Sequence, residues 1–235
     1  MMHVSVLTLF PQVMSPYLEA SILGRAQKAG LLHVTLINPR NFAEPPHYKV
    51  DDIPYGGGDG MVLMCAPWEA AFASLMPLSE KTQVLVTSPA GACFDQPMAR
   101  EFARHCDHLV VLCGHYEGFD ERLIPVLSAY GAPVKEVSVG DYVLTGGELP
   151  ALVMIDAVAR LMPGVVQKAG SVAADSFGVD GLLDYPAYTR PAVYKGHAVP
   201  EVLTSGNHAA IAHWRQEQRA LRTRQFRPDL LADLN

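Results

Sequence analysis

Residues that could bind a ligand gather in three loops, 87–89, 114–118 and 140–148, each of which directly follows an apolar run. Two of these loops are rich in glycine, which lets backbone N–H and C=O groups approach a flat ligand such as adenine closely. The spacing matches neither G-x-x-x-x-G-K-[ST] nor a G-x-G-x-x-G after the first strand, so a P-loop and the usual dinucleotide fingerprint are excluded. One such cluster alone would indicate a tight turn, but three at successive strand ends predict a ligand site.

Several ionisable side chains lie in or near these loops. Glu117 lies inside the second loop, and Asp141 and Glu148 flank the third. Arg160 comes late on the helix predicted to follow, and Asp175 stands further on among small and polar residues. An isolated Asp of this kind is most often a solvated turn residue or a helix cap, so residue type and position leave these roles and a catalytic role open.

The apolar pattern predicts strands and helices in alternation. Strands are expected over 3–9, 32–37, 84–87, 109–113 and 134–139. Helices are expected over 15–29, 67–75, 96–105, 120–128 and 149–161, the first with Ser15 as its cap and Pro16 in its first turn. This alternation is typical of an α/β fold with a parallel sheet, where ligands bind at the carboxyl ends of the strands.

The pattern divides the chain of 235 residues into two domains joined by a linker. Residues 1–162 form the predicted α/β domain, and residues 163–180 read as the linker. Residues 181–235 are expected to form a small, mainly helical domain whose clearest helix covers 208–222. Residues 38–60 form a polar loop rich in Pro and Gly, and a loop of that length in a compact domain is usually functional or disordered.

The charge balance is acidic, with a formal net charge of −6, which at first sight argues against a nucleic-acid partner. The acidic excess lies at the front of the chain, because residues 178–235 hold seven basic and six acidic side chains. Three arginines there, Arg215, Arg219 and Arg222, recur at helical spacing and could contact phosphates. Net charge therefore does not exclude RNA.

Two further features bound the class of protein. No apolar run reaches the ~20 residues of a membrane span, and the start has neither a basic n-region nor a cleavage site, so we expect a cytoplasmic protein without membrane contact. The four cysteines form no C-x-x-C pair, and we expect them to be buried free thiols.

Six motifs resemble those of one enzyme family and occur in its order, from the first strand to about residue 230. They lie at 51–61, 113–122, 138–150, 175–177, 188–191 and 203–208. In these motifs the chain is similar to the bacterial tRNA (guanine-N1)-methyltransferases of the knotted (SPOUT) methyltransferase superfamily. The resemblance implies a knotted α/β domain with a trefoil knot, followed by a small, mainly helical C-terminal domain. It also implies methyl transfer from S-adenosylmethionine to N1 of guanosine 37 of tRNA, next to the anticodon.

The resemblance further implies a homodimer with the active site between subunits, and it assigns roles to individual residues. Asp175 matches the general base and Arg160 the catalytic arginine, while Glu117 and Asp175 would lie near a Mg²⁺ ion. The cofactor-binding positions are Thr87, Ser88, Pro89, Gly114, Tyr116, Glu117, Val139, Gly140, Asp141, Tyr142, Val143, Leu144, Gly146, Gly147 and Pro150. To the RNA contacts predicted from helical spacing, Arg215, Arg219 and Arg222, the resemblance adds Asp51, Ser171, Ser205, Asn207 and His208.

The chain departs from the family pattern at three places. His115 stands where Arg is common, Asp59 stands where Pro is frequent, and the chain stops at Asn235, short of the tail of longer relatives. Apart from these departures, two other functions stay open: a knotted methyltransferase that acts on another RNA nucleotide, and a non-catalytic RNA-binding protein on the same scaffold. The motifs around Tyr116 and Asp175 weigh against the first, and the intact acidic and basic site residues weigh against the second.

Overall fold

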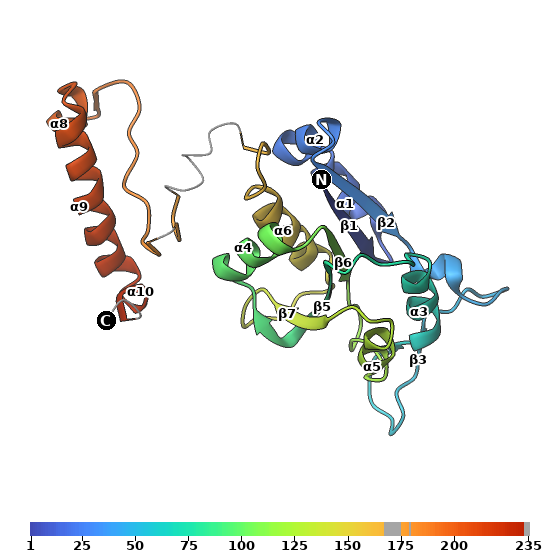
Figure 1. The fold of residues 1–235 in the computed structure, drawn as a ribbon. Coiled ribbons are helices and arrows are strands. Elements are labelled where there is room, and N and C mark those ends of the chain that lie inside the picture. The colour runs from blue at the N-terminus through green and yellow to red at the C-terminus, as the bar shows by residue number, and fades with distance from the viewer. Residues whose placement is uncertain (167–174, 179, 233–235) are drawn as a thin grey trace. The chain divides into compact units, whose positions relative to one another are not determined.

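The computed structural model describes residues 1–166, 175–178 and 180–232. The chain forms two compact units, Met1–Gln167 and Lys168–Asn235, which are treated separately below (Figure 1). Among the described residues, no helix is both long enough and apolar enough to cross a membrane.

The first unit is built on a five-stranded sheet whose strands are all parallel, which confirms the predicted α/β class. Across the sheet the order is β2 (Leu32–Ile37), β1 (Met2–Leu7), β6 (His108–Leu112), β5 (Thr82–Cys93) and β7 (Val134–Ser138). Because β6, β5 and β7 are neighbours and run the same way, the loops that follow them meet at one edge of the sheet. This order brings the three predicted ligand loops together.

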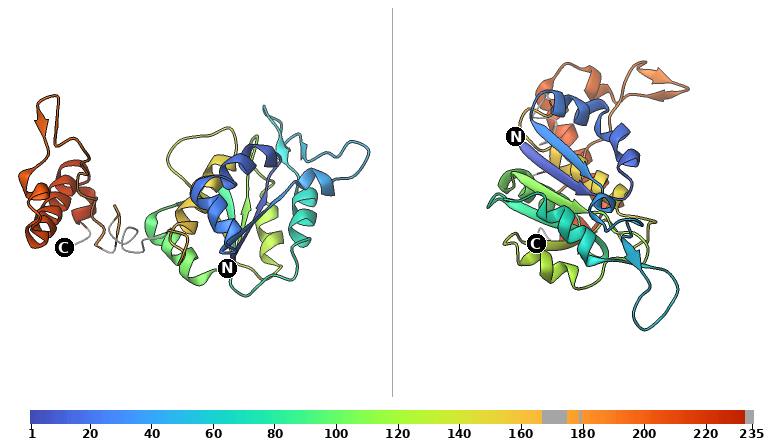
Figure 2. Two further views of the ribbon diagram at one scale, coloured as in Figure 1. Left: turned by 90° about the horizontal axis from the view of Figure 1, so that it is seen from above. Right: turned by 90° about the vertical axis from the view of Figure 1, so that its right-hand side faces the viewer.

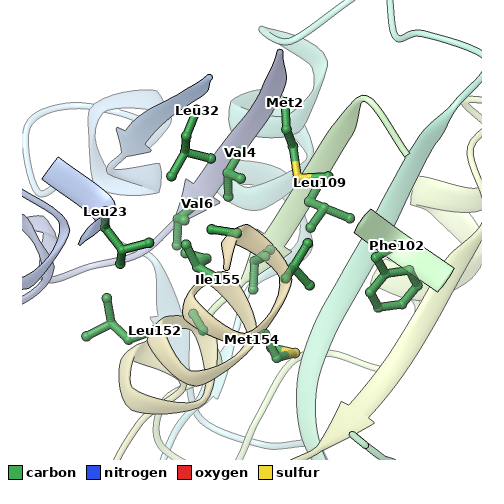
Figure 3. Close-up of a cluster of buried hydrophobic side chains, with 14 of the residues drawn as sticks. Met2, Val4, Val6, Leu23, Leu32, Phe102, Leu109, Leu152, Met154 and Ile155 are labelled. Carbon is green, nitrogen blue, oxygen red and sulfur yellow. The ribbon is translucent and has the colours of Figure 1, made fainter. Parts of the chain in front are cut away.

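Helices cover both faces of the sheet (Figure 2). One face packs against α1 (Pro11–Leu18), α2 (Ser21–Lys28), α4 (Gln96–His105) and α6 (Glu148–Ala159), and the other against α3 (Cys65–Ala73) and α5 (Leu123–Ser128). Figure 3 shows the first core, where Val4 and Val6 of β1 face Ile155 of α6. Alternation along each strand sends neighbouring side chains to opposite cores, as a doubly covered sheet requires.

The predicted helix over 15–29 is wrong in its start and its continuity. Helix α1 begins at Pro11, and Ser15 lies inside it, where its hydroxyl donates to the Pro11 carbonyl at 3.2 Å. Ala20 is extended, with φ −91° and ψ 160°, and it separates α1 from α2. Both Pro11 and Pro16 suit a first helical turn, and the chain uses the earlier one.

Strand β5 is longer than predicted because the pairing with β7 resumes after a break. The register shifts between Thr87 and Ala92, both of which pair with Val137. Residues 88–91 therefore bulge from the strand at the sheet edge where the ligand loops lie. Such bulges re-aim side chains next to functional sites.

The long loop 38–60 contains some regular structure. A short 3-10 helix, η1 (Pro39–Phe42), opens it, and β3 (Asp51–Asp52) pairs antiparallel with β4 (Val62–Leu63). The hairpin's connecting segment contains Gly56, Gly57, Gly58 and Gly60, all at positive φ.

The second unit is mainly helical, as predicted. It contains α8 (Glu201–Thr204), α9 (His208–Phe226) and α10 (Asp229–Ala232). A small hairpin of β8 (Val193–Tyr194) and β9 (His197–Ala198), which the sequence pattern did not predict, precedes them. The segment before the hairpin packs on α9, where the Leu183 N–H donates to the Thr223 hydroxyl at 2.9 Å.

The four cysteines are free, but they are not all buried. Cys113 is buried, Cys65 and Cys106 are half-buried, and Cys93 is exposed, so the prediction of buried thiols is wrong for Cys93. Burial raises the pKa of Cys106 to about 11 and the pKa of Cys113 well above its ordinary value. These two thiols are therefore neutral at physiological pH.

Candidate active site

The loops after β5, β6 and β7 surround one cavity of about 270 Å³. Every predicted cofactor-binding residue except Asp141 lines it. It is also lined by residues that the motifs did not single out for binding: His115, Gly118, Val137, Ser138 and Thr145. All but Val137 are next to a predicted residue in the chain, so continuity along the chain was the signal that could have found them, whereas Val137, in β7, lies two positions before Val139.

Backbone hydrogen bonds tie the three strand ends together. The Gly147 N–H donates to the Gly114 carbonyl at 2.8 Å, and the Gly114 N–H donates to the Thr87 hydroxyl at 3.0 Å. The same hydroxyl donates to the Leu112 carbonyl at 3.1 Å. A Cβ atom on Gly147 would lie 2.1 Å from the Thr87 oxygen and 2.7 Å from Cα of Cys113. Glycine is therefore required there by packing between the loops.

Glu117 is the acidic side chain at the mouth of this cavity. Its N–H donates to the Met61 carbonyl at 3.0 Å, which joins the cavity to the β3–β4 hairpin. A Cβ atom on Gly60 would lie 2.5 Å from Oε1 of Glu117, so the glycine segment of the hairpin passes close to this carboxylate. Among the described residues, no group of three or more His, Cys, Asp or Glu could hold a metal ion.

Arg160 ends α6 and lines a second cavity, of about 630 Å³, rather than the first. Tyr17 also lines it and donates its hydroxyl to Oδ2 of Asp156 at 2.7 Å. This carboxylate raises the pKa of Tyr17. The two cavities are adjacent, because they share part of their lining. The shared residues are Val139, Tyr142, Leu144 and Pro150.

The remaining predicted site residues are divided between the units. Asp51 lies in the first unit, paired with Leu63 across the β3–β4 hairpin. Asp175 lies in the second unit, in a turn where its carbonyl accepts from the Gly178 N–H at 3.0 Å. Ser171 lies outside the described residues.

The predicted RNA-binding residues before α9 form the start of that helix. The Asn207 side chain caps α9 by accepting from the Ala210 N–H at 3.1 Å, and His208 is the first helical residue. Ser205 donates to the Val202 carbonyl at 2.8 Å and ends α8. This motif therefore ends α8 and caps the start of α9.

The arginines of α9 differ in what they contact. Arg219 donates to both oxygens of Asp180 at 2.6 and 2.8 Å and to the Leu183 carbonyl at 3.3 Å, and its side chain is only 12% exposed. These donors hold the unit together, which disfavours the predicted phosphate contact of Arg219. Arg215 is exposed, and its guanidinium carbon lies 4.6 Å from the centroid of the Tyr185 ring. Both residues line a cavity of about 530 Å³.

Comparison with known proteins supports the family resemblance over nearly the whole chain. The family model tRNA (Guanine-1)-methyltransferase TrmD matches residues 2–233. A tRNA (guanine-N(1)-)-methyltransferase of Ruminiclostridium cellulolyticum is 49% identical over 99% of this chain and 97% of its own length. An enzyme of the same name from Moorella thermoacetica is 50% identical over 100% of this chain and 92% of its own length. Another from Synechocystis is 51% identical over 97% of this chain and 95% of its own length. The chain thus belongs to the tRNA (Guanine-1)-methyltransferase TrmD family, whose fold is the SPOUT fold.

Proposed function

We propose that this protein transfers a methyl group from S-adenosylmethionine to N1 of guanosine 37 of tRNA, next to the anticodon, in the cytoplasm. One observation carries the proposal: the three loops that hold the predicted cofactor-binding residues lie around a single cavity at the carboxyl edge of a parallel sheet. Membership of a methyltransferase family supports S-adenosylmethionine as the methyl donor.

The cavity suits a bent nucleoside-type cofactor. Its lining combines small residues, which expose backbone donors and acceptors, with apolar side chains such as Pro89 and Leu144. The loops after β6 and β7 are joined by the Gly147–Gly114 hydrogen bond and by an antiparallel bridge between His115 and Gly146. We place the trefoil knot at these interlocked loops.

We also propose that the active protein is a homodimer formed through an apolar face of the first unit. Val13 and Tyr17 of α1 and Leu149 and Val153 of α6 are each at least half exposed, and all of them except Val13 line the cavity of Arg160. Exposed apolar patches of this kind mark interaction sites. A dimer would let Asp175 of one subunit reach the cofactor cavity of the other.

Guanine N1 carries a proton, so it becomes a nucleophile only when that proton leaves. A carboxylate can accept from N1–H and the exocyclic amine together, and this pairing selects guanine over adenine, which has no N1 donor. We assign this role to Asp175. Positioning N1 in line with the methyl–sulfur bond lowers the entropic barrier further.

Loss of the proton moves negative charge to O6, so this step needs positive charge near O6 as well as a base at N1. A cation at O6 compensates, and we assign this role to Arg160. Mg²⁺ accepts one or two carboxylates together with water and substrate oxygens, and Glu117 would supply one such ligand. A bound Mg²⁺ would add positive charge near the developing oxyanion.

The second unit is proposed to bind the tRNA. The Arg215–Tyr185 stack, with Tyr188 and Arg190 in the same cavity lining, offers aromatic faces and a positive charge to an unpaired base. Asp51, Ser171, Ser205, Asn207, His208 and Arg222 remain proposed RNA contacts. Because the net charge is −6, we expect binding to depend on shape and on these local contacts.

Sinefungin, a cofactor analogue, is expected to compete with S-adenosylmethionine, because both would occupy the cavity formed by the three loops. The test measures initial rates of methyl incorporation into an unmodified tRNA transcript at several concentrations of both compounds. The apparent KM for S-adenosylmethionine should rise with sinefungin while kcat stays constant. Non-competitive inhibition would contradict the assignment of this cavity.

A further inference from the structure

A buried carboxylate contacts the wall of the cavity, and the sequence motifs assigned it no role. Glu148 is the first residue of α6 and is 6% exposed. Its Oε1 accepts from the Thr8 hydroxyl at 2.6 Å, and its Oε2 lies 2.7 Å from Nε2 of His115. One carboxylate therefore joins the end of β1, the loop after β6 and the start of α6.

Because the Glu148 carboxylate is buried, its arrangement depends on both of its partners, Thr8 and His115. Thr8 is fully buried, and its oxygen also accepts from the Phe10 N–H at 2.9 Å. The Phe10 ring packs on the His115 ring with centroids 4.9 Å apart, which limits rotation of the imidazole. A buried carboxylate that loses a donor is left with an unsatisfied oxygen, and that is costly.

The Glu148–His115 contact also explains a glycine in the cavity wall. A Cβ atom on Gly146 would lie 2.3 Å from Cε1 of His115 and 2.7 Å from Oε2 of Glu148. Gly146 and His115 also form an antiparallel bridge. Both loops, which line the same cavity, thus pack closely against the His115–Glu148 contact.

We propose that Glu148 is a positioning residue for the methyl-donor cavity, acting through His115 on one side and anchored by Thr8 on the other. The proposal rests on the proposed function, since it concerns the cavity assigned to S-adenosylmethionine. Holding His115 fixes the backbone of the loop after β6 against the loop after β7. The cavity is then preformed, and binding need not order these loops.

Three variants test the proposal by calorimetric titration with S-adenosylhomocysteine. His115→Ala is expected to lower the affinity about tenfold, because it removes a hydrogen bond to a charged carboxylate. His115→Arg should bring the affinity back to within about threefold of the unaltered protein, because a guanidinium also donates to a carboxylate. Thr8→Val keeps the side-chain shape and does not line the cavity, yet it should weaken binding by at least about threefold. Affinity for tRNA should stay unchanged in all three.

Leu127→Ala in α5 is the matched stability control, because Leu127 is fully buried in the other core and does not line the cavity. It should lower the midpoint of thermal unfolding without weakening S-adenosylhomocysteine binding. The positioning role would be overturned if this control lost as much affinity as Thr8→Val. It would also be overturned if His115→Ala bound S-adenosylhomocysteine normally, or if His115→Arg failed to restore binding. Absence of binding by the unaltered protein would instead overturn the proposed function, and with it the role of this pair.

Discussion

Asp175→Asn is expected to lower the single-turnover rate of methyl transfer by about a thousandfold, within the range for loss of a general base. The amide keeps the size of the side chain but cannot take the N1 proton. Affinity for S-adenosylmethionine should stay within about twofold, because no cofactor-cavity residue changes. The measurements are rapid-quench single turnover and calorimetric titration of the cofactor.

Asp184→Asn is the matched control in the same segment, where Oδ1 accepts a local bond from the Tyr185 N–H at 2.7 Å. An amide oxygen can keep that bond, so turnover should be close to that of the unaltered protein. Near-normal turnover in Asp175→Asn itself would rule out Asp175 as the base.

The same variant can show which subunit supplies Asp175. Gly147→Ala should destroy the cofactor cavity, because its Cβ would overlap the Thr87 hydroxyl. The test uses a heterodimer of one Asp175→Asn subunit and one Gly147→Ala subunit. If Asp175 acts across the interface, the intact cavity of the first subunit meets the intact Asp175 of the second, and the heterodimer should retain about half the activity. An inactive heterodimer would place Asp175 in the site of its own subunit.

Arg160→Ala is expected to lower the single-turnover rate by about a hundredfold, the loss typical of one donor to a developing oxyanion. Affinity for tRNA should fall by no more than about threefold, since the proposed contact forms mainly in the transition state. Arg104→Ala, an exposed arginine in the last turn of α4, provides the matched control. A large loss of tRNA affinity with a normal rate would make Arg160 a phosphate anchor instead.

Elements with strong local signals were predicted well. Helix α4 has its predicted bounds of 96–105, because Asp95 caps it by accepting from the Met98 N–H and Pro97 lies in its first turn. The grouping of the ligand loops also followed from sequence, since alternating strands and helices imply parallel strands whose ends share an edge. The break at Ala20 and the return of β5 to the sheet after residue 91 had no such signal.

The parts of the site that sequence did not predict depend on contacts between distant residues. Glu148 meets Thr8 and His115 across 140 and 33 positions of the chain, and no local pattern encodes that meeting. Arg219 looked available on a helical face, but Asp180, 39 positions away, lies against it. Spacing placed the three arginines on one helix, but it could not show which other side chains contact them.

The most direct test of the proposed function is to map the methylated atom. An unmodified tRNA transcript is incubated with the protein and labelled S-adenosylmethionine, digested to nucleosides, and analysed by mass spectrometry, with a transcript carrying A37 as the control. We predict one 1-methylguanosine, at position 37, and no incorporation into the control. A methyl group on another base would identify a methyltransferase of different specificity, and no incorporation into either transcript would contradict an enzymatic function.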